Sequence, residues 1–265
     1  MVKLTICLLC FFLPLYACAD ISIYKDESTL IGLEKHSRGN VRLTSNLYGG
    51  SSDLGASSPA DCVIKIGITK NKNEYSATLL PFRSGLMSYS STQKDIAYFD
   101  LLENKINIFF EGAVDVCPLG TEFSGEFAVV NKHSKEFDAL FDKLLEENYV
   151  NAVALFRSGK IEQAINSLEP YLTMSGVERF YNERIYNDYG YFLQQNKDYD
   201  ESIKYFEVVK RKNPNRMAVY LNLADSFWEM KSTVKSMSNY RQYVKLMKMA
   251  GHNKQIPSRV LERIN

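Results

Sequence analysis

The second half of the chain repeats one spacing of small and apolar residues three times. Each set begins with a small residue, and three further residues follow it 12, 16 and 19 positions later. The three sets are Ala152, Ala164, Leu168 and Tyr171; Gly190, Ser202, Phe206 and Val209; and Ala224, Ser236, Tyr240 and Tyr243. Two small residues 12 positions apart let two consecutive helices cross closely. Since such a helical hairpin cannot bury its apolar face alone, the spacing predicts stacked hairpins that share a core.

The second and third sets start 34 residues apart, and this unit resembles the tetratricopeptide repeat. The segments that carry the resemblance are Tyr186-Asn187-Asp188-Tyr189-Gly190, Asp198-Tyr199-Asp200-Glu201-Ser202-Ile203, Asn213-Pro214-Asn215 and Tyr220-Leu221-Asn222-Leu223-Ala224. A looser first unit starts 38 residues before the second, which indicates a short insertion around 174–179. Ser202 and Ser236 stand where the family prefers alanine. The resemblance covers roughly residues 145–250, and Pro257–Ile264 is expected to form a final capping helix.

The first half of the chain has a different pattern. Short alternating segments at 41–43, 63–66, 75–79, 96–99, 106–110 and 125–130 predict strands, with turn-forming runs between them. The Gly- and Ser-rich stretch 48–59 is expected to form a long surface loop. We therefore predict an α+β protein. A small antiparallel β-sandwich or barrel over 20–131 precedes an all-α solenoid of about three hairpins over 132–265, whose first helix starts after Ser134. The β region resembles no family that we can name.

The first nineteen residues have the features of a secretory signal peptide. Lys3 precedes an apolar run over 4–15 that is too short to span a bilayer, and Ala17-Cys18-Ala19 has the small-x-small form of a cleavage site. Cleavage after Ala19 predicts an exported chain, periplasmic or secreted. The alternative is a bacterial lipobox at 15–18, in which Cys18 carries a lipid anchor.

Removal of that segment leaves two cysteines, Cys62 and Cys117. In an oxidising compartment an even pair predicts a disulfide, and the alternative is two separate buried thiols. A catalytic thiol is not expected, because no histidine lies near either cysteine in a recognisable motif.

Composition and motifs narrow the class of function. With 45% hydrophobic and 24% charged residues the chain is ordinary for a globular protein, and its net charge of +1 is not that of a dedicated nucleic-acid binder. The sequence contains no phosphate-binding glycine loop, zinc-ligand spacing or nucleophile elbow, so we expect no enzyme, no metal and no cofactor. The three histidines, His36, His133 and His252, are scattered and expected at the surface.

Charge is distributed unevenly within the helical half. Residues 134–203 carry a net charge of −6, and residues 204–265 carry +9. The basic end is expected to be a solvated helical face, or else to meet an acidic partner or an anionic envelope surface.

The resemblance implies a groove for a protein or peptide partner, lined by the first helix of each hairpin. The groove candidates by register are Arg184, Asn187, Tyr191, Gln194, Leu221, Asp225 and Trp228. Aromatic residues and arginine are enriched in interface hot spots, but Trp228 has an alternative role, in which it packs at the edge of the last repeat.

Together these features predict an exported interaction protein, a scaffold or adaptor, and in a narrower form an inhibitor or immunity-type binder. The alternative is a catalytic or ligand-binding β-domain with the repeats as a docking arm. A deep polar pocket in the β-domain would favour that alternative, whereas a filled apolar interior would favour the interaction protein.

Overall fold

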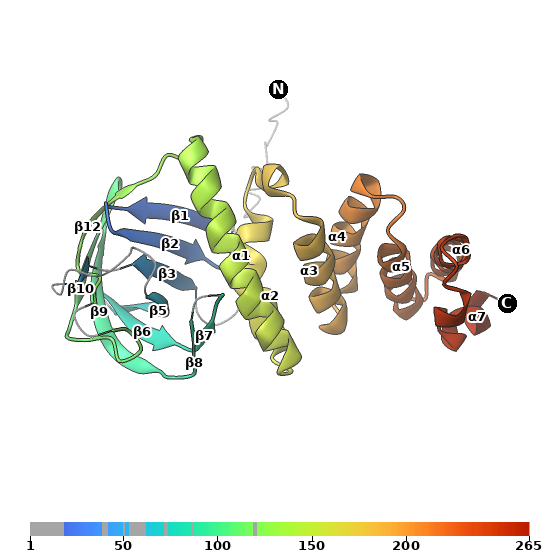
Figure 1. Cartoon of the computed structure of the whole chain (residues 1–265), viewed down its shortest axis with the longest axis horizontal. Helices are drawn as coiled ribbons and strands as arrows, with labels where there is room; N and C mark the ends of the chain where they lie inside the picture. The colour runs from blue at the N-terminus through green and yellow to red at the C-terminus, as the bar shows by residue number, and fades with distance from the viewer. Residues whose placement is uncertain are drawn as a thin grey trace, which may run out of the picture.

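A β-barrel lies at one end of an elongated molecule, and a row of helices leads away from it (Figure 1). The computed structural model describes residues 19–38, 42–49, 51–52, 62–71, 74–85, 87–118 and 121–264. Residues 1–18 of the predicted signal peptide, including Cys18, lie outside the described residues. So does most of the predicted loop at 48–59.

Eight strands, all within the described residues, close the barrel in the order β1-β12-β10-β9-β6-β5-β3-β2, and every neighbouring pair is antiparallel. Their bounds are β1 Asp20–Lys25, β2 Thr29–Lys35, β3 Leu43–Gly49, β5 Val63–Asn71, β6 Glu74–Leu80, β9 Gln93–Leu101, β10 Lys105–Phe110 and β12 Gly125–Val129. Two small sheets pair β4 (Ser51–Ser52) with β11 (Thr121–Glu122) and β7 (Phe82–Arg83) with β8 (Ser88–Tyr89). The barrel decides between the two β architectures that the sequence allowed.

Alternation of apolar side chains explains most of these strands. Ile64, Ile66 and Ile68 of β5 point into the barrel, where they meet the apolar residues of the other strands. The strands predicted at 63–66, 75–79, 96–99, 106–110 and 125–130 correspond to β5, β6, β9, β10 and β12. Of the segment predicted at 41–43, Leu43 begins β3, and residue 41 lies outside the described residues. The sequence analysis missed β1 and β2. All of β2 except Lys35 is buried, so its side chains do not alternate between apolar and polar.

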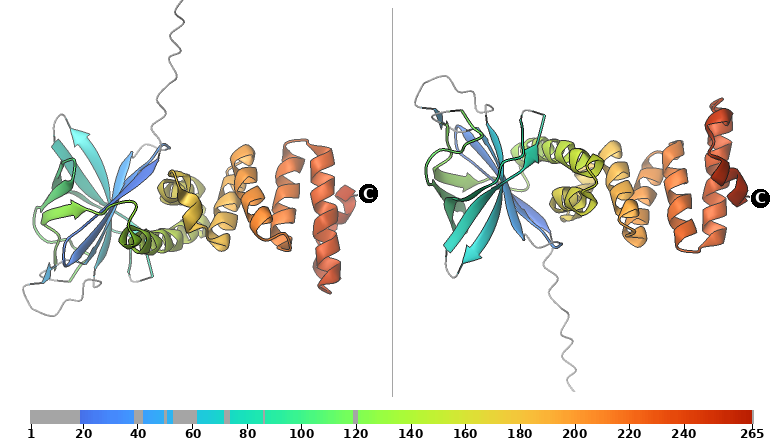
Figure 2. Two further views of the ribbon diagram at one scale, coloured as in Figure 1. Left: turned by 90° about the horizontal axis from the view of Figure 1, so that it is seen from above. Right: turned by 90° about the horizontal axis from the view of Figure 1, so that it is seen from below.

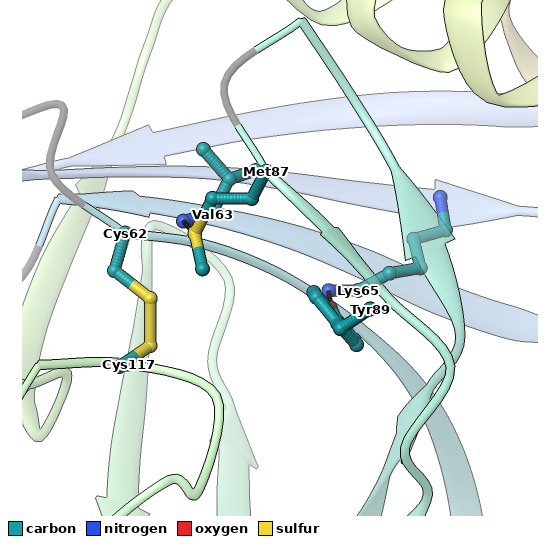
Figure 3. Close-up of a disulfide and its surroundings, with 6 residues drawn as sticks. All are labelled: Cys62, Val63, Lys65, Met87, Tyr89 and Cys117. Atoms are coloured by element: carbon teal, nitrogen blue, oxygen red, sulfur yellow. Dashed lines mark hydrogen bonds between the residues drawn. A yellow bond between two sulfur atoms is a disulfide. The ribbon is translucent and has the colours of Figure 1, made fainter.

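The predicted disulfide is confirmed. Cys62, directly before β5, bonds to Cys117 between β10 and β11, and their Cα atoms are 5.6 Å apart (Figure 3). The β7–β8 hairpin lies beside the same part of β5. There the Val63 N–H donates to Met87 Sδ at 3.1 Å, and the Lys65 N–H donates to Tyr89 Oη at 2.8 Å. Side chains of the hairpin thus satisfy backbone donors at the start of β5, whose pairing with β6 begins at Lys65.

The helical half consists of three hairpins and a short final helix (Figure 2). The hairpins are α1 (Lys135–Arg157) with α2 (Ile161–Thr173), α3 (Glu183–Gln195) with α4 (Tyr199–Lys212), and α5 (Met217–Glu229) with α6 (Thr233–Met249). The final helix is α7 (Ser258–Ile264), which corresponds to the predicted capping helix. Ser134 caps α1 as predicted, since its hydroxyl accepts the Phe137 N–H at 3.0 Å. No helix of the described part of the chain is both long and apolar enough to cross a bilayer.

The repeat spacing predicted the helical core correctly. All residues of the three spaced sets are buried. Gly190 shows why the leading position must be small, because a Cβ built there would lie 2.8 Å from the ring of Phe206 on α4. The insertion expected around 174–179 forms a 3-10 turn, η1 (Val177–Phe180), between α2 and α3.

The barrel and the first hairpin share one hydrophobic core. Ile21 and Ile23 of β1, Tyr48 of β3 and Val63 of β5 join the same buried cluster as α1 and α2. Gly32 of β2 permits a close approach, because an added Cβ there would lie 2.8 Å from Leu144 of α1. This packing covers the outer face of four strands and fixes the solenoid on the barrel.

Candidate protein-interaction face

The first helices of the three hairpins, α1, α3 and α5, present a common surface that we call the inner face. Side-chain contacts connect these helices in order. Tyr149 of α1 donates a hydrogen bond from Oη to Asp188 of α3 at 2.6 Å, and Gln194 of α3 donates to the Asn222 carbonyl of α5 at 2.7 Å. We define the inner face by Tyr149, which is buried but connects α1 to α3, and by its open or partly open side chains: Val153, Phe156, Arg184, Asp188, Tyr191, Leu221, Asp225 and Trp228.

Tyr191 is the exposed aromatic residue of the inner face, with 37% of its surface open to solvent. Its ring lies 5.6 Å from that of Phe156, which in turn stacks on Phe192 at 4.5 Å. Because Phe156 packs against its ring from one side, Tyr191 offers apolar area whose conformation is already restricted.

Trp228 is less open than Tyr191. It packs against the core of the repeats, and the guanidinium of Arg263 on α7 lies 4.4 Å from its ring centroid. The final helix therefore covers part of the only tryptophan, so the packing role considered for Trp228 is present in the structure.

Two groove candidates lie within the helix packing. Asn187 and Gln194 are each 7% exposed. Gln194 uses its amide to bind Ser226 and the Asn222 carbonyl, both at 2.7 Å, and these bonds join the second and third hairpins. Their position follows from the close helix crossing at Gly190, which brings this part of α3 against its neighbours.

The charged groove candidates are paired inside the molecule. Arg184 binds Glu146 of α1 at 2.5 Å and lies over the ring of Tyr149. Asp225 accepts Arg259 at 2.7 Å and Arg263 at 3.2 Å from α7. Asp188, the remaining charged side chain of the inner face, forms no ion pair with a described residue and accepts hydrogen bonds from Tyr149 and Asn187.

Sequence reasoning missed the contribution of α1. Tyr149 and Phe156 lie 3 residues before and 4 residues after Ala152. The same offsets from Ala224 lead to Leu221 and Trp228, so the repeat register itself contained the signal. The groove candidates were taken only from the two better-matching units.

A cluster of charged and polar side chains is buried between the barrel and the first hairpin. Glu34 of β2 forms an ion pair with Lys65 of β5 and accepts a hydrogen bond from Tyr171 Oη of α2 at 2.5 Å. Lys65 Nζ also donates to Asn46 at 2.7 Å and to Asn148 of α1 at 3.1 Å.

Burial by itself would raise the pKa of Glu34, but Lys65 and His36 lower it to about 2. Burial lowers the pKa of Lys65, and Glu34 opposes that shift.

His36 corrects an expectation, because it belongs to this buried cluster and is only 5% exposed. Its Nε2 lies 2.7 Å from Thr44 Oγ1, and its ring stands between the carboxylates of Glu34 and Glu169. Beside it, Arg38 reaches Asp198 at the start of α4 with a contact of 2.9 Å. The polar contacts of the barrel therefore extend to the second hairpin, and the buried position of Glu34, His36 and Glu169 suits orientation of the two halves, not ligand binding.

The basic end of the chain forms an open helical face. Helix α6 carries four basic side chains and no acidic one, and Arg241, Lys245 and Lys248 of this helix are exposed. This face agrees with the uneven charge seen in the sequence, and nothing in the structure identifies a partner for it.

The outer surface of the barrel has an aromatic hollow on β9, β10 and β12. Tyr98 and Phe109 are cross-strand neighbours there, and Phe109 is 64% exposed. Asp100 and Glu126 border them, which gives this hollow an acidic rim. No sequence motif had pointed to it. Among the described residues no group of three or more His, Cys, Asp or Glu is placed to hold a metal ion.

Comparison with known proteins supports the assignment of the helical half. The tetratricopeptide repeat family matches residues 183–210, which contain α3 and most of α4. The match covers one of the three hairpins, and the helical half as a whole forms a tetratricopeptide-like solenoid. No curated protein matches the chain.

Several solved structures are similar to parts of the chain. PcrH from Pseudomonas aeruginosa is 13% identical with a TM-score of 0.39, over 49% of this chain and 91% of PcrH. The type III secretion translocator chaperone SycD of Yersinia enterocolitica is 20% identical with a TM-score of 0.40, over 46% and 89% of the two chains. MamA from Desulfovibrio magneticus RS-1 is 14% identical with a TM-score of 0.35, over 48% and 82%.

Proposed function

We propose that this protein is an exported scaffold or adaptor whose inner face binds a protein or peptide partner. The observation that carries the proposal is the exposed Tyr191, whose ring packs against Phe156 of α1 on a surface built by three first helices. Rigid aromatic side chains that bury a large area at low entropic cost are typical of interface hot spots.

The pairing of charged side chains on the inner face indicates what kind of partner segment it would bind. Arg184 pairs with Glu146, Asp225 pairs with both Arg259 and Arg263, and Asp188 forms no ion pair with a described residue, so the charges of this group cancel. A partner segment therefore gains little from charge, and we expect an apolar or aromatic segment of low net charge. An inhibitor or immunity-type role is a narrower form of the same proposal.

The barrel interior favours this function over the alternative of a catalytic or ligand-binding β-domain. Apolar side chains of the strands fill the barrel, among them Leu47, Ile66, Ile106 and Phe127, each at most 1% exposed.

Export is supported by the disulfide Cys62–Cys117, because disulfides persist in oxidising compartments. Cleavage after Ala19 and acylation of Cys18 remain the two proposed forms of the mature chain.

Site-specific photo-crosslinking in the native envelope tests the proposal. A benzophenone amino acid replaces Tyr191 on the inner face in one variant. Matched variants carry it at Val234, which is 83% exposed on α6, and at Phe109 on the barrel. We expect a defined protein adduct from position 191 and none from the other two. Equal adducts from all three positions, or an adduct from position 109 alone, would move the interface away from the inner face.

A further inference from the structure

The irregular spacing between the first and second repeats coincides with a hollow. The turn η1 occupies the extra residues, and it is anchored on the first hairpin. Phe180 stacks on Phe141 of α1 at 4.0 Å, and Arg179 binds Asp138 at 3.0 Å. Held in this way, Val177 and Tyr181 form one wall of a hollow of about 530 Å³ between η1, α2, α3 and α4.

The floor of the hollow is apolar and aromatic. Leu172 and Val208 contribute aliphatic surface, and three tyrosines surround it. The rings of Tyr181 and Tyr186 are 5.0 Å apart, and those of Tyr186 and Tyr205 are 5.7 Å apart in an edge-on arrangement. Concave sites with this lining and volume suit a planar organic group.

One hydroxyl in the wall of the hollow lacks a hydrogen-bond partner. The Tyr181 hydroxyl is buried, and no hydrogen-bond partner for it occurs in the described part of the protein. Tyr205 differs, since its hydroxyl donates to the Leu172 carbonyl at 3.2 Å. A buried hydroxyl without a partner is unfavourable, so a bound acceptor at this position would be stabilised.

The charge of the rim favours a ligand of negative charge. Of the rim side chains, Glu201 is paired with Lys204 at 2.6 Å. Arg211 and Lys212 in the last turn of α4 are exposed and form no ion pair with any described residue, and Lys212 Nζ lies 5.7 Å from the Tyr181 ring centroid. Glu178 is the remaining acidic rim residue, which leaves an excess of one positive charge.

We propose that this hollow is a binding site for an aromatic anion, a planar apolar group that carries a carboxylate, sulfonate or phosphate. The ring system would lie among the three tyrosines, and the anion would meet Arg211 and Lys212 at the rim. The site is separate from the inner face, so it stands independently of the proposed partner groove.

Two fluorescent probes that share one ring system test the proposal on the purified protein. The probes are 8-anilinonaphthalene-1-sulfonate and its neutral counterpart N-phenyl-1-naphthylamine. We expect one saturable site for the sulfonate and binding of the neutral probe weaker by about tenfold, the usual size of a charge-assisted contact. Absence of a saturable site, or equal affinity for both probes, would overturn the proposal.

Charge reversal locates the site. Arg211→Glu with Lys212→Glu should weaken sulfonate binding by about tenfold or more and leave the neutral probe unaffected. The matched control, Lys245→Glu with Lys248→Glu, changes the same charge on α6 and should have no effect on either probe. Equal weakening by the two pairs would mean a general electrostatic effect instead of a site. Tyr191→Ala should not change probe binding, which separates this test from that of the inner face.

Discussion

The buried pair of Glu34 and Lys65 is the residue-level feature with the clearest energetic consequence. Both side chains are enclosed between the barrel and the first hairpin, and each has further hydrogen-bond partners there. Removal of one partner from a buried ion pair leaves an uncompensated charge, whereas removal of both partners does not.

We therefore expect Glu34→Gln to lower the free energy of unfolding by about 3–5 kcal/mol. The double variant Glu34→Gln with Lys65→Met should recover a large part of this loss, because it removes both charges. Urea unfolding at neutral pH measures the difference. Equal stability of the single and double variants would show that Lys65 is not left as a buried charge.

The same pair predicts a pH dependence. The pKa of Glu34 is about 2 in the folded protein against 4.5 for the free side chain, so the unfolded chain binds the proton first as the pH falls. The stabilisation is therefore complete above the unfolded value of 4.5 and is lost towards pH 2, a total of about 3 kcal/mol. Unfolding measured across this range should show the free energy of unfolding of the wild type, relative to that of the double variant, falling by about this amount between pH 4.5 and pH 2. A difference independent of pH would contradict this account.

Gly190 carries the second residue-level prediction. A larger side chain there would enter the space of the buried Phe206 ring, so Gly190→Leu should destabilise the protein by about 1–3 kcal/mol or more. Gln195→Leu introduces the same side chain at an exposed position of the same helix and serves as the control. Thermal unfolding compares the two. An unchanged midpoint for Gly190→Leu would mean that the proposed register is wrong.

At the scale of elements, the disulfide ties the start of β5 to the segment after β10. The two cysteines are 55 positions apart in the sequence, and the loop that they close contains β5, β6, β9 and β10, four of the eight barrel strands. Mass spectrometry of alkylated, unreduced protein from its native envelope should find Cys62 and Cys117 bonded to each other. Two alkylated thiols would contradict the expected oxidation.

Loss of this bond should destabilise the barrel. Replacement of both cysteines by serine is expected to cost about 4 kcal/mol, because the unfolded chain regains the freedom of the closed loop. Chemical unfolding of the double variant, compared with that of the oxidised wild type, gives this value directly. A decrease of less than about 1 kcal/mol in the free energy of unfolding would mean that the disulfide contributes little to the cooperative unfolding of the barrel.

At the scale of the whole molecule, the shared core predicts that the two halves depend on each other. Residues 132–265 alone would expose the faces of α1 and α2 that contact Ile21, Ile23 and Tyr48. We expect hydrogen exchange in α1 and α2 to accelerate in this fragment, while α3 to α6 keep most of their protection. Equal protection of α1 in the fragment and in the whole chain would show that the solenoid folds independently.

The sequence by itself determined the helical hairpins, the core positions and the disulfide. Each rests on a local or periodic signal: small residues at 12-residue spacing, apolar residues that fill the gaps, and an even pair of cysteines. Gly190 and Phe206 illustrate the reason, since their contact follows from the spacing once two helices pair. The role of α1 in the inner face was accessible in the same way, through Tyr149 and Phe156.

Other features depended on contacts between residues far apart in the chain. Strand β2 has no alternation because the barrel and α1 bury opposite sides of it, and His36 is enclosed only because α2 packs over the end of that strand. The hollow beside η1 needs side chains from four elements that only the tertiary structure brings together. Trp228 is partly covered because Arg263, 35 residues later, folds back over it. Periodicity records which side of an element is buried, but only the fold decides which distant side chains meet there.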